Sequence, residues 1–242
     1  MKSRKDKPIG LIVAENLAAA PVFERYGLDF CCHGDRTLDA ACREQGIAAD
    51  QIEAELDALE RPAEAGRPDP AAMAVDELAR YIVATHHVFT KGALRTISAH
   101  FETVVRVHGA RHPGLTGLHE AFAGLRDELE LHLAKEEEVL FPYLEALVEA
   151  QRDGAPLPHA CFAEVSQPIA MMEREHEEAG AVLDRMHDST GGFEPPPDAC
   201  NTYRLLFRKL AGLEQDLHRH IALENHLLFP KSVELEQRLR ER

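Results

Sequence analysis

Two stretches of the chain decide its fold: His132-Leu-Ala-Lys-Glu136-Glu-Glu-Val-Leu-Phe141-Pro142 and His220-Ile-Ala-Leu-Glu224-Asn-His-Leu-Leu-Phe229-Pro230. Both read His, three residues, Glu, four residues and then Phe-Pro, and the copies lie 88 positions apart. Residues i and i+4 project from the same face of an α-helix, so one helix can aim a His and a Glu at the same place. The spacing therefore predicts two related helices, each with a His and a Glu on one face.

Apolar residues extend this face along four long stretches, at about 75–108, 115–149, 161–188 and 199–240. They recur at spacings of three and four, the period of a helix with one buried face. The predicted buried faces are Ile82, His86, Phe89, Ala93 and Ile97; Leu118, Phe122, Leu125, Leu129, His132, Glu136 and Val139; Val165, Ile169, Met172, His176, Ala179, Leu183 and Met186; and Leu206, Leu210, Leu213, Leu217, His220, Glu224 and Leu227. Four such helices with short connections predict an antiparallel four-helix bundle.

Polar residues interrupt every one of these apolar faces near its middle. An unpaired ionised group in a core costs several kcal/mol, so six of them at matched depth need a common partner. Mixed imidazole and carboxylate ligands suit iron or manganese, whereas calcium prefers oxygen and structural zinc prefers sulfur. We therefore predict a dinuclear metal site, with iron as the expected metal, whose ligands are His86, His132, Glu136, His176, His220 and Glu224.

Other polar residues beside these faces are weaker candidates. Glu128 and Glu175 flank His132 and His176, where they could orient the imidazoles or relay protons. His87, next to His86, is expected to lie outside the ligand set.

The chain before the bundle has a different character. Short helical patterns at 11–26, 38–44 and 47–59 predict a small helical domain over residues 1–60. A Pro-rich linker is expected at 61–72, and the bundle fills 73–242, so the predicted fold is all-α. The small domain carries the adjacent pair Cys31 and Cys32. Asp29 and Gly34 on either side favour an exposed turn, and a protonated His33 would favour a thiolate.

Composition excludes several classes of function. The formal net charge of −15 argues against nucleic acid and against anionic membrane surfaces, because both select for Lys and Arg. No stretch approaches the roughly twenty apolar residues of a membrane span. Five cysteines, two of them adjacent, do not form a secreted disulfide framework, so we expect a cytoplasmic protein.

The two His-x3-Glu-x4-Phe-Pro segments, with His86 and His176, resemble hemerythrin-like domains. The stretch Tyr26-Gly27-Leu28-Asp29-Phe30-Cys31-Cys32-His33-Gly34 resembles the paired-cysteine signature of the small domain that precedes such bundles in the RIC (repair of iron centres) family. The resemblance also covers Glu173-Arg-Glu-His176-Glu-Glu-Ala-Gly180 and Pro195-Pro-Pro-Asp-Ala-Cys200. His33 stands where the relatives carry Gly, and Cys42 is an addition.

The resemblance implies a di-iron protein that acts on iron–sulfur clusters damaged by nitric oxide or oxidants. The four histidines would be terminal ligands of two oxo- and carboxylate-bridged non-haem irons, and Glu136 and Glu224 would bridge them. Cys31 and Cys32 would be functional thiols. Damaged iron–sulfur proteins would be the clients, and NO, O2 or peroxide the small ligands.

Three functions stay open at this point. The chain could donate iron or remove NO during repair, act as an NO reductase-like or peroxidase-like enzyme, or bind and sense NO or O2 without turnover. The oligomeric state is open as well, with a homodimer as one option. Oxygen-carrying hemerythrins have a fifth His, and here Gly180 stands four residues after His176. This predicts a more open, carboxylate-richer site that favours reaction with NO, peroxide or O2, or release of iron, over simple reversible O2 carriage.

Overall fold

The computed structural model describes residues 3–59 and 69–242, and within them the fold is helical, with one isolated backbone bridge between Pro8 and Thr37. The prediction of an all-α chain with a small helical N-terminal region and a four-helix bundle is confirmed. The chain divides into two compact units. The first comprises Met1–Tyr81, Leu144–Ser166 and His218–Arg242, and the second comprises Ile82–Tyr143 and Gln167–Leu217.

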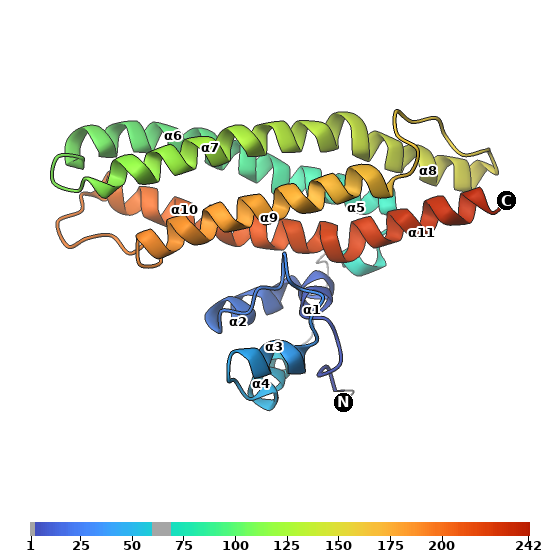
Figure 1. Ribbon diagram of the computed structural model, residues 1–242, viewed down its shortest axis with the longest axis horizontal. Helices are drawn as coiled ribbons and strands as arrows, with labels where there is room; N and C mark the ends of the chain where they lie inside the picture. Colours follow the sequence, from blue (N-terminus) through green and yellow to red (C-terminus); the bar gives the residue numbers. More distant parts are fainter. Residues whose placement is uncertain (1–2, 60–68) are drawn as a thin grey trace. The chain divides into compact units, whose positions relative to one another are not determined.

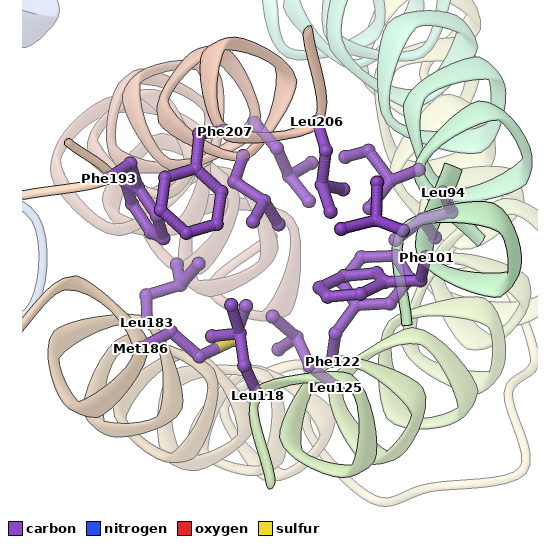
Figure 2. Packing of buried hydrophobic residues seen from close by; sticks show 14 of the residues in the cluster. Leu94, Phe101, Leu118, Phe122, Leu125, Leu183, Met186, Phe193, Leu206 and Phe207 are labelled. Carbon is purple, nitrogen blue, oxygen red and sulfur yellow. The ribbon is translucent and has the colours of Figure 1, made fainter. Parts of the chain in front are cut away.

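The second unit is built from four helical segments that run side by side (Figure 1). They are α6 (Val88–His108), α7 (Gly114–Lys135), α9 (Ser166–Ser189) and α10 (Asn201–Leu223), the last as far as Leu217. Their apolar side chains meet in one core that includes Phe101, Phe122 and Leu183, all at most 1% exposed. Figure 2 shows these side chains converging from all four helices.

The first unit holds the N-terminal helices together with the end of the chain. It contains α1 (Ile9–Glu15), α2 (Ala20–Arg25), α3 (Leu38–Glu44), α4 (Ala49–Leu59), α5 (Val75–Ile82), most of α8 (Phe141–Asp153) and α11 (Phe229–Arg240). Short 3-10 turns lie at η1 (Leu17–Ala19) and η2 (Pro70–Ala72). The N-terminal core residues, among them Phe23 and Leu38, pack with Ile221 and Ala222 near the end of α10.

Three of the long helices contain a wider, π-helical turn of five residues. These turns are η3 (Val83–His87), η4 (Glu136–Leu140) and η5 (Glu224–Leu228). Each lies in the sequence directly between two α-helical segments: α5 and α6, α7 and α8, and α10 and α11. By contrast, α9 is α-helical along its whole length.

The wider turns correct two predicted core positions. A π turn holds one more residue than an α turn, so the buried face moves on by one position within the turn or just after it. Phe89 and Val139 are each 44% exposed, while the next residues, Thr90 and Leu140, are buried. The predicted faces of the third and fourth helices are buried as expected.

Smaller differences concern helix boundaries. The third long helix begins at Ser166 and not at Cys161, because Pro168 fits the first turn of a helix but would break its interior. The stretch predicted as one helix at 11–26 is interrupted at Asn16, whose side chain accepts a hydrogen bond from the Ala18 N–H. Of the predicted linker 61–72, residues 61–68 lie outside the described residues. Over the described ranges, no helix is long and apolar enough to cross a membrane.

Candidate metal centre and thiol loop

The π turns place the predicted ligands. Glu136 is the first residue of η4, Glu224 is the first residue of η5, and His86 lies in η3. In both repeats the Phe N–H after the turn donates to the carbonyl of the Glu that opens it, five residues back. The Pro that follows has no N–H to continue the ladder, so Phe-Pro coincides with the return to α-helix. The repeated segment therefore encodes a wide turn as well as a pair of ligands.

In the second unit, three predicted ligands come together. The ligand atoms of His132, Glu136 and His176 all lie within 4.8 Å of one another, and all three side chains are buried. His132 Nε2 lies 3.1 Å from His176 Nε2 and 3.3 Å from Glu136 Oε1. Two imidazole nitrogens and a carboxylate oxygen thus point at a common space.

Within this set, Glu136 is the residue whose buried charge is least stabilised by hydrogen bonds. Its side chain is fully buried, and neither carboxylate oxygen accepts a hydrogen bond from any described residue. Its neighbours are Nε2 of His132 at 3.3 Å and Nε2 of His87 at 3.5 Å, one at each oxygen. A buried carboxylate without hydrogen bonds is costly, and a bound cation removes that cost.

Outer carboxylates fix the orientation of the imidazoles. His132 Nδ1 lies 2.8 Å from Glu175 Oε2, and Lys135 bonds the other oxygen of Glu175. Burial alone would raise the pKa of Glu175, but the hydrogen bonds from Lys135 and His132 lower it below its ordinary value. An ionised Glu175 can only accept, so His132 Nδ1 carries a proton, and Nε2 is the ring nitrogen that faces Glu136 and His176.

His87 repeats this arrangement. Its side chain is fully buried, its Nδ1 lies 2.7 Å from Glu137 Oε1, and its ring stacks on Phe141. Lys91 Nζ donates to both oxygens of Glu137, at 2.7 and 2.6 Å. Burial would raise the pKa of Glu137, but its bonds to Lys91 and His87 lower it. We therefore assign a proton to His87 Nδ1, and Nε2 is the ring nitrogen that faces Glu136.

His86 is buried as well, and its Nδ1 lies 3.0 Å from Asp216 Oδ1. The sets of mutually close ligand atoms among the described residues include its neighbour His87 and not His86. Of the two flanking carboxylates, Glu175 contacts a predicted ligand, whereas Glu128 is exposed.

The first unit contains the second His-x3-Glu pair. His220 Nε2 lies 2.9 Å from Glu224 Oε1, and both side chains are buried, at 2% and 0% exposure. The spacing of four thus brings the two groups onto one face, as predicted. Imidazole and carboxylate donors in this proportion fit iron better than calcium or structural zinc.

The cysteine pair lies in a loop between α2 and α3 that Asp29 organises. The Cys31 and Cys32 N–H groups donate to Asp29 Oδ1 at 3.1 and 3.0 Å, and Cys31 Sγ lies 3.3 Å from the same oxygen. His33 Nδ1 lies 2.5 Å from Asp29 Oδ2. The two sulfur atoms are 3.6 Å apart, which is too far for a disulfide bond.

This geometry corrects the expectation of an exposed turn with an activated thiolate. The side chain of Cys31 is buried, with 6% of its surface exposed, and the side chain of Cys32 is partly exposed. The hydrogen bond to Cys32, burial and the charge of Asp29 raise the pKa of Cys31 well above its ordinary value. His33 binds the carboxylate and not the sulfur, so Cys31 is a protonated thiol at neutral pH.

Two residues of η5 contact this loop within the first unit. Asn225 Nδ2 donates to the Cys31 carbonyl at 3.2 Å, and His226 Nε2 lies 3.1 Å from the Phe30 carbonyl. The His226 ring occupies the space that side chains at Gly10 and Gly34 would need. The segment that carries Glu224 is thereby joined to the backbone of the thiol loop.

Sequence reasoning missed His87, Glu137 and Asp216. The adjacency of His86 and His87 was a signal, but consecutive residues of a regular α-helix point about 100° apart, so the helical period assigns only one of them to the face toward the site. The π turn η3 changes that register. Glu137 and Asp216 act across helices, and no spacing along the chain identifies such partners.

Two family models match the chain. The hemerythrin HHE cation binding domain matches residues 78–232. The ScdA_N model, described as a domain of unknown function (DUF542), matches residues 5–60.

Curated relatives match over nearly the full length. An iron–sulfur cluster repair protein YtfE of Cronobacter sakazakii is 36% identical over 231 residues, which is 95% of this chain and 97% of the relative. The protein of the same name from Escherichia coli O81 is 33% identical over the same shares of both chains. The one from Enterobacter sp. (strain 638) is 32% identical over 230 residues.

Proposed function

Because this chain belongs to the family of iron–sulfur cluster repair proteins that join a ScdA_N domain to a hemerythrin HHE cation-binding domain, we propose that it repairs iron–sulfur clusters damaged by nitrosative or oxidative stress. Its clients would be the damaged iron–sulfur proteins themselves. A cytoplasmic setting suits the five cysteines, an odd number with two of them adjacent, because this pattern is not that of a secreted disulfide framework.

The observation that carries the proposal is the buried carboxylate of Glu136 between two imidazole nitrogens. We propose that two non-haem irons are held by His86, His132, His176 and His220, with Glu136 and Glu224 as shared carboxylates and an oxo group as a further bridge. Bound there, the irons would supply redox chemistry toward NO, O2 or peroxide and a store of iron for an empty cluster site.

The chain's own residues set the conditions for that chemistry. Glu175 and Asp216 hold the Nδ1 sides of His132 and His86, which leaves their Nε2 atoms for the metal. The surrounding apolar core keeps bulk water away, which strengthens charge interactions at the site. Cys31 and Cys32 would act as thiols that accept or pass on iron or reducing equivalents. The protonated state of Cys31 means that it must lose its proton to do so.

Transfer of labelled iron tests this function. The chain, loaded anaerobically with ⁵⁷Fe, is mixed with a nitric oxide-damaged [4Fe–4S] protein, and recovery of client activity is measured together with the label in the rebuilt cluster. We expect recovery with the wild type and loss of recovery with Glu136→Ala.

Glu138→Ala is the matched control, because Glu138 lies two positions further along the same turn and is exposed. Catalytic consumption of NO without label in the client would favour the reductase reading. Binding of NO with neither transfer nor turnover would favour a sensor. Recovery that is equal with wild type and with Glu136→Ala would refute the proposal.

A further inference from the structure

A thiol and an imidazole, those of Cys200 and His108, are in contact within the second unit. His108 is the last residue of α6, and Cys200 lies directly before the first residue of α10. Nε2 of His108 lies 3.2 Å from Sγ of Cys200, within hydrogen-bond distance for sulfur. His108 is 8% exposed, whereas Cys200 is exposed. The thiol can therefore be reached from solvent while its partner is held inside the protein.

Packing fixes the His108 ring beside the sulfur. Its centroid lies 5.4 Å from the ring of Tyr203, a buried residue in the first turn of α10, and 6.3 Å from the ring of His112. An imidazole held within hydrogen-bond reach of a thiol can take the thiol proton as the sulfur attacks an electrophile. The pair therefore has the geometry of a nucleophile and its base.

The loop that carries Cys200 also gathers positive charge. The guanidinium group of Arg204 donates to the carbonyls of Ala199 and Pro197, at 3.1 and 3.2 Å. The Cys200 carbonyl accepts from the Arg204 N–H at 3.0 Å, so the thiol lies at the N-terminus of α10, a helix of 23 residues. Cationic groups and helix N-termini stabilise the negative charge that develops on an attacking sulfur.

The carboxylate of Asp198, two residues before Cys200, is occupied by other groups. Nε2 of His112 lies 3.1 and 3.2 Å from its two oxygens, and Arg111 donates to Oδ2 at 3.3 Å. The hydrogen bonds from His112 and Arg111 lower the pKa of Asp198 below its ordinary value. The ionised carboxylate is thus bound to an imidazole and a guanidinium.

The thiol loop of the first unit provides the contrast. There the carboxylate of Asp29 lies 3.3 Å from the Cys31 sulfur itself, and Cys31 is buried. A negative charge in that place opposes ionisation of the sulfur, whereas the imidazole of His108 assists it. The surroundings of Cys200 are those of a reactive thiol.

A structural role is the competing explanation. The thiol could simply complete the hydrogen bonding of a mostly buried imidazole and help to begin α10. That explanation predicts that removal of His108 changes stability alone, and that Cys200 reacts no faster than another exposed thiol of the chain.

We propose that Cys200 is a site of oxidation by hydrogen peroxide, with His108 as its base. The sulfur attacks one peroxide oxygen, so that an S–O bond forms and the O–O bond breaks. The sulfur loses two electrons to the peroxide, and the thiol proton passes by way of His108 Nε2 to the departing oxygen, which leaves as water. The product is a sulfenic acid at Cys200. The reaction uses no metal, so this inference goes beyond the proposed repair function and does not rest on it.

The full-length chain contains a matched control thiol, Cys161. It is also exposed, and no hydrogen bond joins its thiol to any residue that the structure describes. The chain is treated with hydrogen peroxide at pH 7 in the presence of dimedone, which traps sulfenic acids, and the labelling rate of each cysteine peptide is measured by mass spectrometry. We expect Cys200 to be labelled at least about tenfold faster than Cys161.

Two variants test the role of the base. His108→Gln removes the imidazole, and we expect the labelling rate of Cys200 to fall to within about twofold of that of Cys161. His119→Gln is the control, because His119 is a partly buried imidazole of the same unit that stacks on Phe101. It should leave the rate of Cys200 unchanged. If His108→Gln does not fold, the comparison of the two thiols in the wild type still decides the question.

The outcomes also separate this inference from the repair function. The measurement is made on the iron-loaded chain and on the metal-free chain, and we expect the same rate at Cys200 in both. A rate no higher than that of Cys161, a rate unchanged in folded His108→Gln, or labelling that requires iron would overturn the proposal. A chain that fails to repair damaged clusters but shows fast labelling of Cys200 would leave it standing.

Discussion

The two copies of the repeated segment share a backbone and differ in what surrounds it. In both, the Glu opens a π turn and the Phe-Pro pair ends it. The residue after the Glu is Glu137 in the first copy and Asn225 in the second. Glu137 bonds His87 and Lys91 inside the second unit, whereas Asn225 donates to the Cys31 carbonyl inside the first.

This difference shows that the repeated and the variable positions of the segment have separate roles. The repeated positions provide ligands and the turn that aims them, and the variable positions decide what the turn is attached to. One copy is supported by charged residues of neighbouring helices. The other is attached to the loop that carries the two thiols, so the chain links a proposed iron ligand, Glu224, to Cys31 through one hydrogen-bonded turn.

Removal of the repeated Glu should have the largest effect, and an equal one in both copies. We expect Glu136→Ala and Glu224→Ala each to reduce bound iron from two per chain to one or fewer, because each deletes a shared ligand. Iron content after anaerobic loading measures this.

The metal-free form of Glu136→Gln should be at least as stable as the wild type in urea, since a buried charge without hydrogen bonds is removed.

Unequal losses of iron in Glu136→Ala and Glu224→Ala would show that the two glutamates do not have equivalent roles. Full iron content in one Ala variant would show that its Glu does not bind metal. A large loss of stability in metal-free Glu136→Gln would show that the carboxylate has a structural partner and would weaken the argument for the site.

Gly34 tests how tightly the second copy is joined to the thiol loop. A Cβ there would meet Nε2 of His226 in the second copy, and it would also meet the Phe30 carbonyl oxygen and Gly10 Cα, which are backbone atoms that cannot move cheaply. We expect Gly34→Ala to lower the free energy of unfolding by about 1–3 kcal/mol, measured by urea denaturation. Gly92→Ala, in an open position on α6, should be neutral or stabilising by up to about 1 kcal/mol. Equal effects of the two changes would contradict the close packing.

Asn225 tests the hydrogen bond that distinguishes the second copy from the first. Asn225→Ala leaves the Cys31 carbonyl without this donor, and we expect a loss of about 0.5–1.5 kcal/mol of stability. Gln237→Ala removes an exposed amide from α11 and should change stability by less than about 0.5 kcal/mol. A loss no larger than that of the control would mean that the turn does not support the loop.

A substitution at Asp29 tests what sets the protonation state of the Cys31 thiol, and we expect the smallest effect from it. Asp29→Asn keeps an oxygen that can accept from the Cys31 and Cys32 N–H groups but removes the negative charge, which lowers the pKa of Cys31 toward its ordinary value. We therefore expect faster alkylation of Cys31 at pH 8 in this variant, followed by peptide mass spectrometry. An unchanged rate would show that burial and the Cys32 bond alone control the thiol.

The raised pKa of Cys31 also sets the sign of a pH effect on stability. The folded thiol keeps its proton at a pH where the unfolded thiol, with a pKa near 8.5, has lost it. The folded state then binds more protons, so the free energy of unfolding should fall as pH rises above about 8.5. Asp29→Asn should reduce that fall.

The sequence by itself determined the helices and the inward position of the repeated ligands. A helical period fixes which residues share a face, so the placement of His132 with Glu136 and of His220 with Glu224 could be read from a spacing of four. The same period located the buried faces of the third and fourth helices. The third is α-helical from Ser166 to Ser189, and the fourth is α-helical as far as Leu223, so its predicted face meets the π turn only at its end.

Only the tertiary structure decided the rest. A π turn adds a single residue, which leaves the apolar pattern almost unchanged yet moves the buried face from Phe89 to Thr90 and brings His87 inward. The partners of the imidazoles, Glu137, Glu175 and Asp216, depend on which helices face each other, and Cys31 is buried because other segments cover it. The spacing of residues along one helix shows which side chains share a face of that helix, whereas these features arise from contacts between segments far apart in the chain.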